Sequence, residues 1–237
     1  MKKNIPNFLT CCNLFTGCIA IVMALRNHLE FASILIFVAA LFDFLDGFSA
    51  RMLDAKSAIG PDMDSLADII SFGVTPAMIL LVWTEQCMEN LPPATQSFGI
   101  VPLLPYIVFI IPAFSAIRLA KFNQDKRQTN SFRGLPTPAN AFFLGFLHFS
   151  SETIPFVANF WIIIALAFIF SILLITDIPM FSLKMVNFKW KDNMFRYFFL
   201  LISLILIIIF KLGAFPVIIL FYILSSFIYN VIKSPLS

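Results

Sequence analysis

The sequence predicts an all-α fold, a polytopic membrane protein built as a helical bundle. Hydrophobic residues make up 60% of the 237 residues, charged residues only 12%, and the mean hydropathy is +0.93. Such a composition leaves too little polar surface for a soluble globule of this size. The apolar runs are continuous rather than alternating, which argues against the short alternating strands of a membrane barrel.

Eight apolar stretches are expected to form helices that cross or enter the membrane. A helix needs about 20 mostly apolar residues to span ~30 Å of hydrocarbon. The expected helices cover residues 8–26, 31–53, 63–84, 101–122, 138–150, 156–176, 194–210 and 213–232. The fifth is short, so whether residues 138–150 span fully stays open. The whole chain, 1–237, is expected to form a single integral membrane domain.

Local signals support the ends of these helices. Gly60-Pro61 suits a helix start, because proline is tolerated in the first turn. An acidic loop around Pro92-Pro93 separates the third helix from the fourth, and the turn at 134–138, rich in proline, precedes the fifth. The last two helices, within 194–232, contain few groups capable of chemistry. We therefore expect them to serve packing or assembly.

Basic residues predict the orientation of the bundle. With eight spans and the N-terminus inside, the outer loops hold only Arg26 and Lys211. The cytoplasmic segments and adjoining helix ends hold Lys2, Lys3, Arg51, Lys56, Arg118, Lys121, Lys126, Arg127, Arg133, Lys184, Lys189, Lys191, Arg196 and Lys233. The positive-inside rule therefore places the connection from Arg51 to Pro61 toward the cytoplasm, and we expect a cytoplasmic (inner) membrane protein with its active site on that side. The mild net charge of +3 suits anionic membrane lipid better than nucleic acid.

Carboxylates within the second expected helix are the most informative feature of the chain. Asp43, Asp46, Gly47, Ala50 and Arg51 stand at i, i+3, i+4, i+7 and i+8, which places all five on one helical face. An ionised side chain in hydrocarbon costs at least ~2.5 kcal/mol on insertion scales. Several together require cations or water that offset this cost, so the cluster predicts a functional site.

The third expected helix adds a second acidic pair one turn apart, Asp64 and Asp68. A hairpin of the two helices allows both pairs to face each other near the cytoplasmic end. Carboxylate oxygens are preferred ligands of hard divalent cations, and converging carboxylates can hold two such ions around phosphoryl oxygens. Small residues beside them, Gly47 and Ala50, leave room for a nucleotide. In isolation these two would instead be assigned to close helix packing.

The complete pattern, D-x-x-D-G-x-x-A-R, eight residues, then G-x-x-x-D-x-x-x-D, resembles the signature of the CDP-alcohol phosphotransferases. Its fixed positions are filled by Asp43, Asp46, Gly47, Ala50, Arg51, Gly60, Asp64 and Asp68. The resemblance implies a six-helix catalytic core, here about residues 5–180, with the helices of 194–232 as additions. It also implies two divalent metal ions, Mg²⁺ or Mn²⁺, and transfer from a CDP-activated donor to an alcohol.

The same resemblance implies roles for individual residues. Asp43, Asp46 and Asp64 would ligate metal, and Asp68 would act as general base and also as a metal ligand. The CDP-binding residues would be Asn7, Thr10, Gly47, Ala50, Arg51 and Gly60. For Asn7 and Thr10 an equally good interpretation is that they cap the first helix.

Three further segments narrow the acceptor alcohol. Residues 6–17, 65–77 and 118–140 look like the membrane-embedded CDP-diacylglycerol:serine O-phosphatidyltransferases. That resemblance covers about residues 5–145 and implies CDP-diacylglycerol and L-serine as substrates, with phosphatidylserine and CMP as products. Four residues would bind serine or phosphate: Arg118, Lys121, Asn123 and Arg133. An arginine fork can bind a carboxylate through two hydrogen bonds.

Other interpretations stay open at this point. The acceptor could be glycerol phosphate or inositol phosphate, although a phosphate dianion would favour a denser basic cluster. From a different class, intramembrane aspartates also serve cation transporters. Against transport, the carboxylates gather at one end of one hairpin, and no broken helices match it in a second half. The resemblance further implies a homodimer, with the C-terminal helices as one contact surface.

Overall fold

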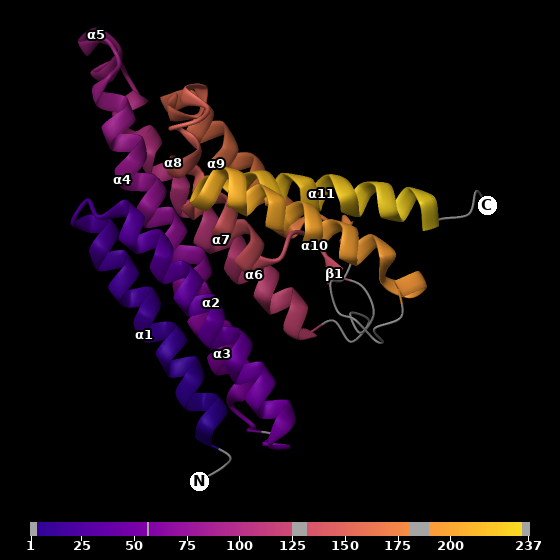
Figure 1. Ribbon diagram of the computed structural model, residues 1–237. Helices are drawn as coiled ribbons and strands as arrows, with labels where there is room; N and C mark the ends of the chain where they lie inside the picture. Colours follow the sequence, from indigo (N-terminus) through magenta and orange to yellow (C-terminus); the bar gives the residue numbers. More distant parts are fainter. Residues whose placement is uncertain (1–3, 56, 125–131, 181–189, 234–237) are drawn as a thin grey trace.

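The computed structural model describes residues 4–55, 57–124, 132–180 and 190–233, which are almost entirely helical (Figure 1). The first half contains α1 (Ile5–Leu25), α2 (Leu29–Met52), α3 (Gly60–Asp68), the π-helix η2 (Ile69–Val74), α4 (Thr75–Glu89), α5 (Pro93–Gln96), the 3₁₀-helix η3 (Val101–Phe109) and α6 (Ile110–Gln124). The second half contains β1 (Phe132–Arg133), α7 (Thr137–Gly145), α8 (Leu147–Ser150), η4 (Pro155–Ala158), α9 (Phe160–Ile175), β2 (Pro179–Met180), α10 (Trp190–Phe210), η5 (Lys211–Gly213) and α11 (Ala214–Lys233).

Helices lie at all eight expected places, with boundaries that differ by a few residues. The expected fifth helix, 138–150, is divided into α7 and α8 at Phe146. The expected fourth helix begins as the 3₁₀-helix η3, which contains Pro105. The short strands β1 and β2 pair antiparallel, Phe132 opposite Met180. Two-residue strands are too short to give an alternating pattern, so the sequence did not reveal them.

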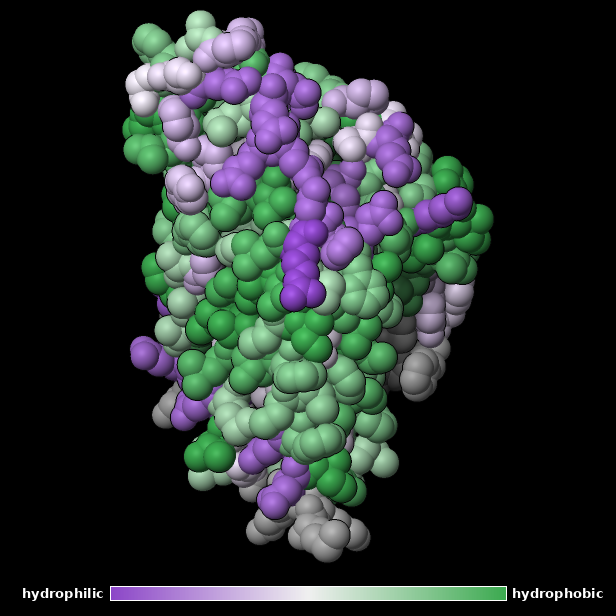
Figure 2. Space-filling model, turned by 90° about the vertical axis from the view of Figure 1, so that its left-hand side faces the viewer, coloured by the Kyte–Doolittle hydropathy of each residue, from purple (hydrophilic) through white to green (hydrophobic). Residues whose placement is uncertain are grey.

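The helices make this an integral membrane protein. By length and apolar composition, five helical runs in the described residues could cross a membrane: Ile5–Leu25, Leu29–Met52, Gly60–Glu89, Val101–Gln124 and Asn193–Asn230. The last run combines α10 and α11, while α9 is apolar but shorter. Figure 2 shows a broad apolar surface on the α1 side of the molecule, with hydrophilic residues gathered above and below it.

The run from Gly60 to Glu89 is helical throughout but changes its hydrogen-bonding pattern at η2. Pro76 has no N–H to donate to the carbonyl four residues earlier, so an undisturbed α-helix is not available there. Instead, the Thr75 N–H donates to the Ile70 carbonyl, five residues back, and the Thr75 hydroxyl donates to the same oxygen (2.9 Å). A π turn often marks a functional site. This one directly follows Asp68.

Helix α1 packs against α2, α3 and η2, and small or polar residues form its buried face. Across this interface the Ser71 hydroxyl donates to the Asn13 carbonyl (3.1 Å), and the Thr75 hydroxyl donates to the Gly17 carbonyl (3.2 Å). Gly17 lies so close to η2 that a Cβ added there would contact the Ser71 hydroxyl and lie 3.0 Å from Ser71 Cα. The glycine therefore sets the distance between α1 and the helix that carries Asp68.

The C-terminal hairpin of α10 and α11 projects sideways from the other helices in Figure 1. Its inner end packs on α7 and α8, where the Ser150 hydroxyl donates to the Gly213 carbonyl (3.3 Å). Only 22% of its most apolar window is buried. Near its other end, α11 contacts β2, where Asn230 Nδ2 donates to the Pro179 carbonyl (2.6 Å). The hairpin still exposes most of its apolar surface.

We expect Gly17→Val to destabilise the fold by about 1–3 kcal/mol, as for other overpacked interiors. The branched side chain has to push α1 away from the Ser71 backbone. Gly47→Ala is the matched control, because the nearest atom to a Cβ there is Arg51 Nη1 at 3.6 Å, an ordinary contact. Thermal unfolding of purified protein in detergent measures both, and an unchanged midpoint for Gly17→Val would contradict the proposed role in packing.

Candidate functional site

Three of the four predicted carboxylates converge. Asp43 of α2 and Asp64 and Asp68 of α3 each offer an oxygen within 4.8 Å of the others. Asp68 is 8% exposed, and the other two are half-buried. At this separation and an effective dielectric constant of about 20, each pair of ionised carboxylates repels by about 3.5 kcal/mol. Ionised together, they therefore require nearby positive charge.

The donor set fits a hard divalent cation. Carboxylate oxygens are the ligands that Mg²⁺, Ca²⁺ and Mn²⁺ prefer. Asp64 Oδ1 is buried, and within the part of the chain that the structure describes it accepts no hydrogen bond. A buried carboxylate oxygen without a donor is costly unless something satisfies it. A bound cation would do so, and the cluster can therefore hold a metal ion.

Asp46 lies outside this three-residue group. It is 6% exposed, and its Oδ2 accepts a hydrogen bond from the Thr10 hydroxyl of α1 (2.7 Å). The same hydroxyl donates to the Pro6 carbonyl (3.1 Å). Asp46 faces a cavity that Asp64 also lines. A role for Asp46 in metal binding stays a prediction, while its contact with α1 is a new observation.

That cavity, of about 430 Å³, gathers most of the predicted nucleotide-binding residues. Its lining comes from α1, α2, the connection that follows α2, and α3: Pro6, Asn7, Thr10, Asp46, Gly47, Ala50, Ala55, Ser57, Gly60, Pro61 and Asp64. Arg51 does not line it and is exposed, although its Nη1 lies near Gly47. The fold thus brings five of the six predicted residues around one cavity beside the aspartate cluster.

Two polar residues near this cavity were missed by the sequence prediction. Asn13 Nδ2 donates to Asp68 Oδ1 (3.3 Å), and Asn13 is fully buried. Ser57 accepts a hydrogen bond from Asn7 Nδ2 (3.3 Å), which ties α1 to the α2–α3 connection. Asn13 had a signal in the sequence, because it shares the polar face of α1 with Thr10 one turn earlier. Ser57 lies in the non-helical α2–α3 connection, so no helical spacing in the sequence pointed to it.

The predicted acceptor-binding residues are only partly brought together. Arg118 is 9% exposed, and its Nη1 donates to the Thr137 hydroxyl at the start of α7 (2.7 Å). Arg118 and Lys121 line a small cavity of about 30 Å³ together with Asp177, which the sequence prediction did not include. This cavity therefore combines both signs of charge.

The sequence predicts that Asn123 and Arg133 share a binding site with Arg118 and Lys121, and the described part of the structure does not place them together there. Asn123 is exposed and donates to the Ser65 hydroxyl (2.9 Å), so it connects α6 with α3 rather than lining the cavity of Arg118. The backbone of Arg133 forms β1, whereas its side chain lies outside the described residues. A role for Arg133 stays a prediction.

Comparison with known proteins identifies the same region. The model of the CDP-alcohol phosphatidyltransferase family matches residues 3–173. A protein of Mycobacterium tuberculosis named CDP-diacylglycerol--serine O-phosphatidyltransferase is 34% identical over 197 residues, which are 77% of this chain and 63% of that protein. The chain thus spans less than two thirds of the length of this mycobacterial relative.

Two relatives of the same name match over more of their own length. The Bacillus subtilis protein is 33% identical over 150 residues, which cover 63% of this chain and 78% of the relative. The Helicobacter pylori protein is 30% identical over 206 residues, covering 85% and 81%. The region that the family model matches, residues 3–173, contains the aspartate cluster and the cavity beside it. The chain belongs to the CDP-alcohol phosphatidyltransferase family.

Proposed function

We propose that this protein transfers the phosphatidyl group of CDP-diacylglycerol to the hydroxyl of L-serine, giving phosphatidylserine and CMP. One observation carries the proposal. The carboxylates of Asp43, Asp64 and Asp68 converge beside a cavity that the family signature also lines. The printed names of the relatives, which are serine O-phosphatidyltransferases, support this choice within the family.

The donor would bind in the 430 Å³ cavity. Gly47 and Ala50 on α2 leave space for the nucleotide, and Asn7 on α1 offers a polar contact. The Arg51 guanidinium, exposed at the end of α2, would attract the diphosphate. The acyl chains would stay in lipid, since the donor enters sideways from the membrane.

Two divalent ions, Mg²⁺ or Mn²⁺, would be held by Asp43, Asp64 and Asp68, with Asp46 as a further ligand. When bound, divalent ions neutralise phosphoryl oxygens and stabilise the charge that develops on the leaving nucleotide. The carboxylates would hold the positive charge of the ions in a fixed place, and the Thr10 hydroxyl orients Asp46 through its 2.7 Å hydrogen bond. Preorganised groups of this kind supply much of the catalysis in phosphoryl transfer.

Serine would be bound through its charged groups at the mouth of the Arg118 cavity, which at about 30 Å³ admits only a small part of the molecule. Arg118 and Lys121 are cationic and suit the carboxylate, while Asp177 suits the ammonium group. A zwitterion needs both signs of charge, whereas a phosphate dianion would be repelled by Asp177. This arrangement favours serine over glycerol phosphate or inositol phosphate as the acceptor.

Asp68 would take the proton of the serine hydroxyl as its oxygen attacks the phosphorus attached to the lipid. The new O–P bond forms while the bond from phosphorus to the CMP oxygen breaks. Asn13 positions Asp68 by donating to one of its oxygens. The charge of Arg51 beside the cavity would help to hold the departing nucleotide.

The distribution of Lys and Arg in the loops supports the proposal that the protein lies in the cytoplasmic membrane with its aspartate cluster toward the cytoplasm. A homodimer that uses the exposed apolar surface of α10 and α11 is also part of the proposal, as is a catalytic core of about residues 5–180. A cation transporter is the second candidate class, because transporters also use buried intramembrane carboxylates.

Purified protein supplied with CDP-diacylglycerol and a panel of alcohols tests the proposal directly. We expect CMP release and phosphatidylserine with L-serine, but no lipid product with glycerol phosphate or inositol phosphate. Because the carboxylates need bound cations, EDTA is expected to stop CMP release and added Mg²⁺ or Mn²⁺ to restore it. A lipid product formed with another alcohol instead of serine would identify that alcohol as the acceptor. Metal flux without CMP release would favour a transporter.

Asp68→Asn keeps the size of the side chain but removes the proton acceptor. We expect kcat to fall by about 10²- to 10⁴-fold, the usual contribution of a general base, while donor binding is kept. Asn13→Ala, which removes only the hydrogen bond to Asp68, is expected to lower kcat less. Steady-state kinetics and equilibrium binding of CDP-diacylglycerol measure these effects. Near-native turnover of Asp68→Asn would eliminate Asp68 as the base.

Arg118→Gln and Asp177→Asn are each expected to raise KM for serine by about 10- to 100-fold, since each loses a hydrogen bond to a charged group. KM for CDP-diacylglycerol should change little. Asp62→Asn removes an exposed carboxylate of α3 and serves as the control for charge alone. If Arg118→Gln raised KM for the donor and left KM for serine unchanged, the acceptor site would lie elsewhere.

A further inference from the structure

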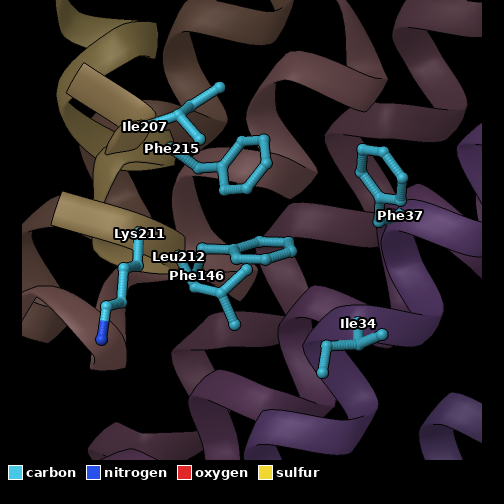
Figure 3. Close-up of a pocket in the computed structure, with 7 residues that line it drawn as sticks. All are labelled: Ile34, Phe37, Phe146, Ile207, Lys211, Leu212 and Phe215. Carbon is cyan, nitrogen blue, oxygen red and sulfur yellow. The ribbon is translucent and has the colours of Figure 1, made fainter. Parts of the chain in front are cut away.

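A second cavity lies in the half of the bundle away from the aspartates. It has a volume of about 480 Å³ and is lined by Ile34, Phe37, Phe146, Ile207, Lys211, Leu212 and Phe215 (Figure 3). Ile34 and Phe37 belong to α2, each nine residues before Asp43 or Asp46, so the cavity is displaced by about 14 Å along the helix. It is therefore separate from the cavity proposed for the nucleotide.

The wall of this cavity is apolar apart from one cation. Figure 3 shows the rings of Phe37, Phe146 and Phe215 around the hollow, with Lys211 at its margin and its ammonium group directed away from the rings. Of the described residues that line the cavity, only Lys211 carries a charge. A volume of this order suits an acyl chain, and a cation at the rim suits a phosphate.

Lys211 also lies at the polar end of the bundle, where a lipid headgroup would be. It opens the turn η5, and the Gly213 carbonyl of the same turn accepts a hydrogen bond from the hydroxyl of Ser150, the last residue of α8. The neighbouring residue Ser151 lines a polar cavity with Asn27 of the α1–α2 turn. The three turns therefore share one end of the molecule, and Lys211 is exposed there.

The backbone of Lys211 supplies an independent observation. Its φ angle is 51°, in the left-handed region that favours glycine. A left-handed residue ends many helices, and Asn27 after α1 and Asp54 after α2 have the same kind of φ, so the conformation follows from the helix end, whereas the choice of lysine over glycine does not. The cationic side chain is the property that a glycine would lack.

We propose that this cavity binds an anionic phospholipid, with one acyl chain among Phe37, Phe146 and Phe215 and its phosphate at Lys211. The lipid fills the space between α2, the α7–α8 break and the α10–α11 hairpin. It would thereby attach the sparsely buried hairpin to the rest of the bundle. This site is independent of the proposed reaction and requires no substrate.

Native mass spectrometry and thermal unfolding in a neutral detergent test the proposal with two probes, phosphatidylglycerol and phosphatidylcholine. We expect phosphatidylglycerol to bind more tightly and to raise the unfolding midpoint further. Lys211→Gln should weaken phosphatidylglycerol binding by about fivefold, as one lysine near a membrane surface contributes. Phosphatidylcholine binding should be unchanged. Arg26→Gln, which removes a cation at another turn, is the matched control and should behave as wild type.

Two more variants separate lipid binding from the local effect of the turn. Lys211→Gly relieves the backbone strain, so it should raise the midpoint without lipid yet still weaken phosphatidylglycerol binding. Ile34→Trp fills the cavity and should weaken binding of both lipids. Equal binding of the two lipids by wild type, or an unchanged preference in Lys211→Gln and Lys211→Gly, would overturn the proposal. A change of oligomeric mass in Ile34→Trp without lipid would assign the cavity to a second copy instead.

Discussion

The convergence of like charges in an apolar bundle is the constraint on which the rest of the structure depends. One carboxylate oxygen of each of Asp43, Asp64 and Asp68 lies within 4.8 Å of the others, and the burial of Asp68 reduces the screening of these charges by water. Apolar packing cannot offset such repulsion. The arrangement is therefore stable with all three groups ionised only when cations occupy it, which couples the structure of the α2–α3 hairpin to its ligands.

Helix α1 is the element that keeps this constraint in place. Its hydroxyl and amide side chains reach both acidic helices, Thr10 to Asp46 on α2 and Asn13 to Asp68 on α3. Gly17 lets α1 approach η2, and the Thr75 hydroxyl joins η2 to the Gly17 carbonyl. Two of the carboxylates, those of Asp46 and Asp68, are consequently oriented by α1, which contributes to the preorganisation that electrostatic catalysis requires.

Most of the helices could be predicted, because continuous apolar runs of about 20 residues leave few alternatives to a membrane helix. The break at Phe146 and the π-helix after Asp68 could not. At the break, the Ser33 hydroxyl of α2 donates to the Gly145 carbonyl (2.6 Å), and the π-helix precedes Pro76, which cannot donate a backbone hydrogen bond. The polar face of α1 was visible in the sequence. Its partners were not, because they lie 36 and 55 residues away along the chain.

The sequence by itself determined the class of protein and the identity of its acidic residues, since helical spacing alone places Asp43, Asp46, Gly47, Ala50 and Arg51 on one face. Only the tertiary structure decided which of them meet. It separated Asp46 from the three-residue cluster and placed Asp177 beside Arg118. It also directed Asn123 to the Ser65 hydroxyl, away from the Arg118 cavity. Spacing fixes directions within one helix, whereas distances between helices depend on how their side chains pack.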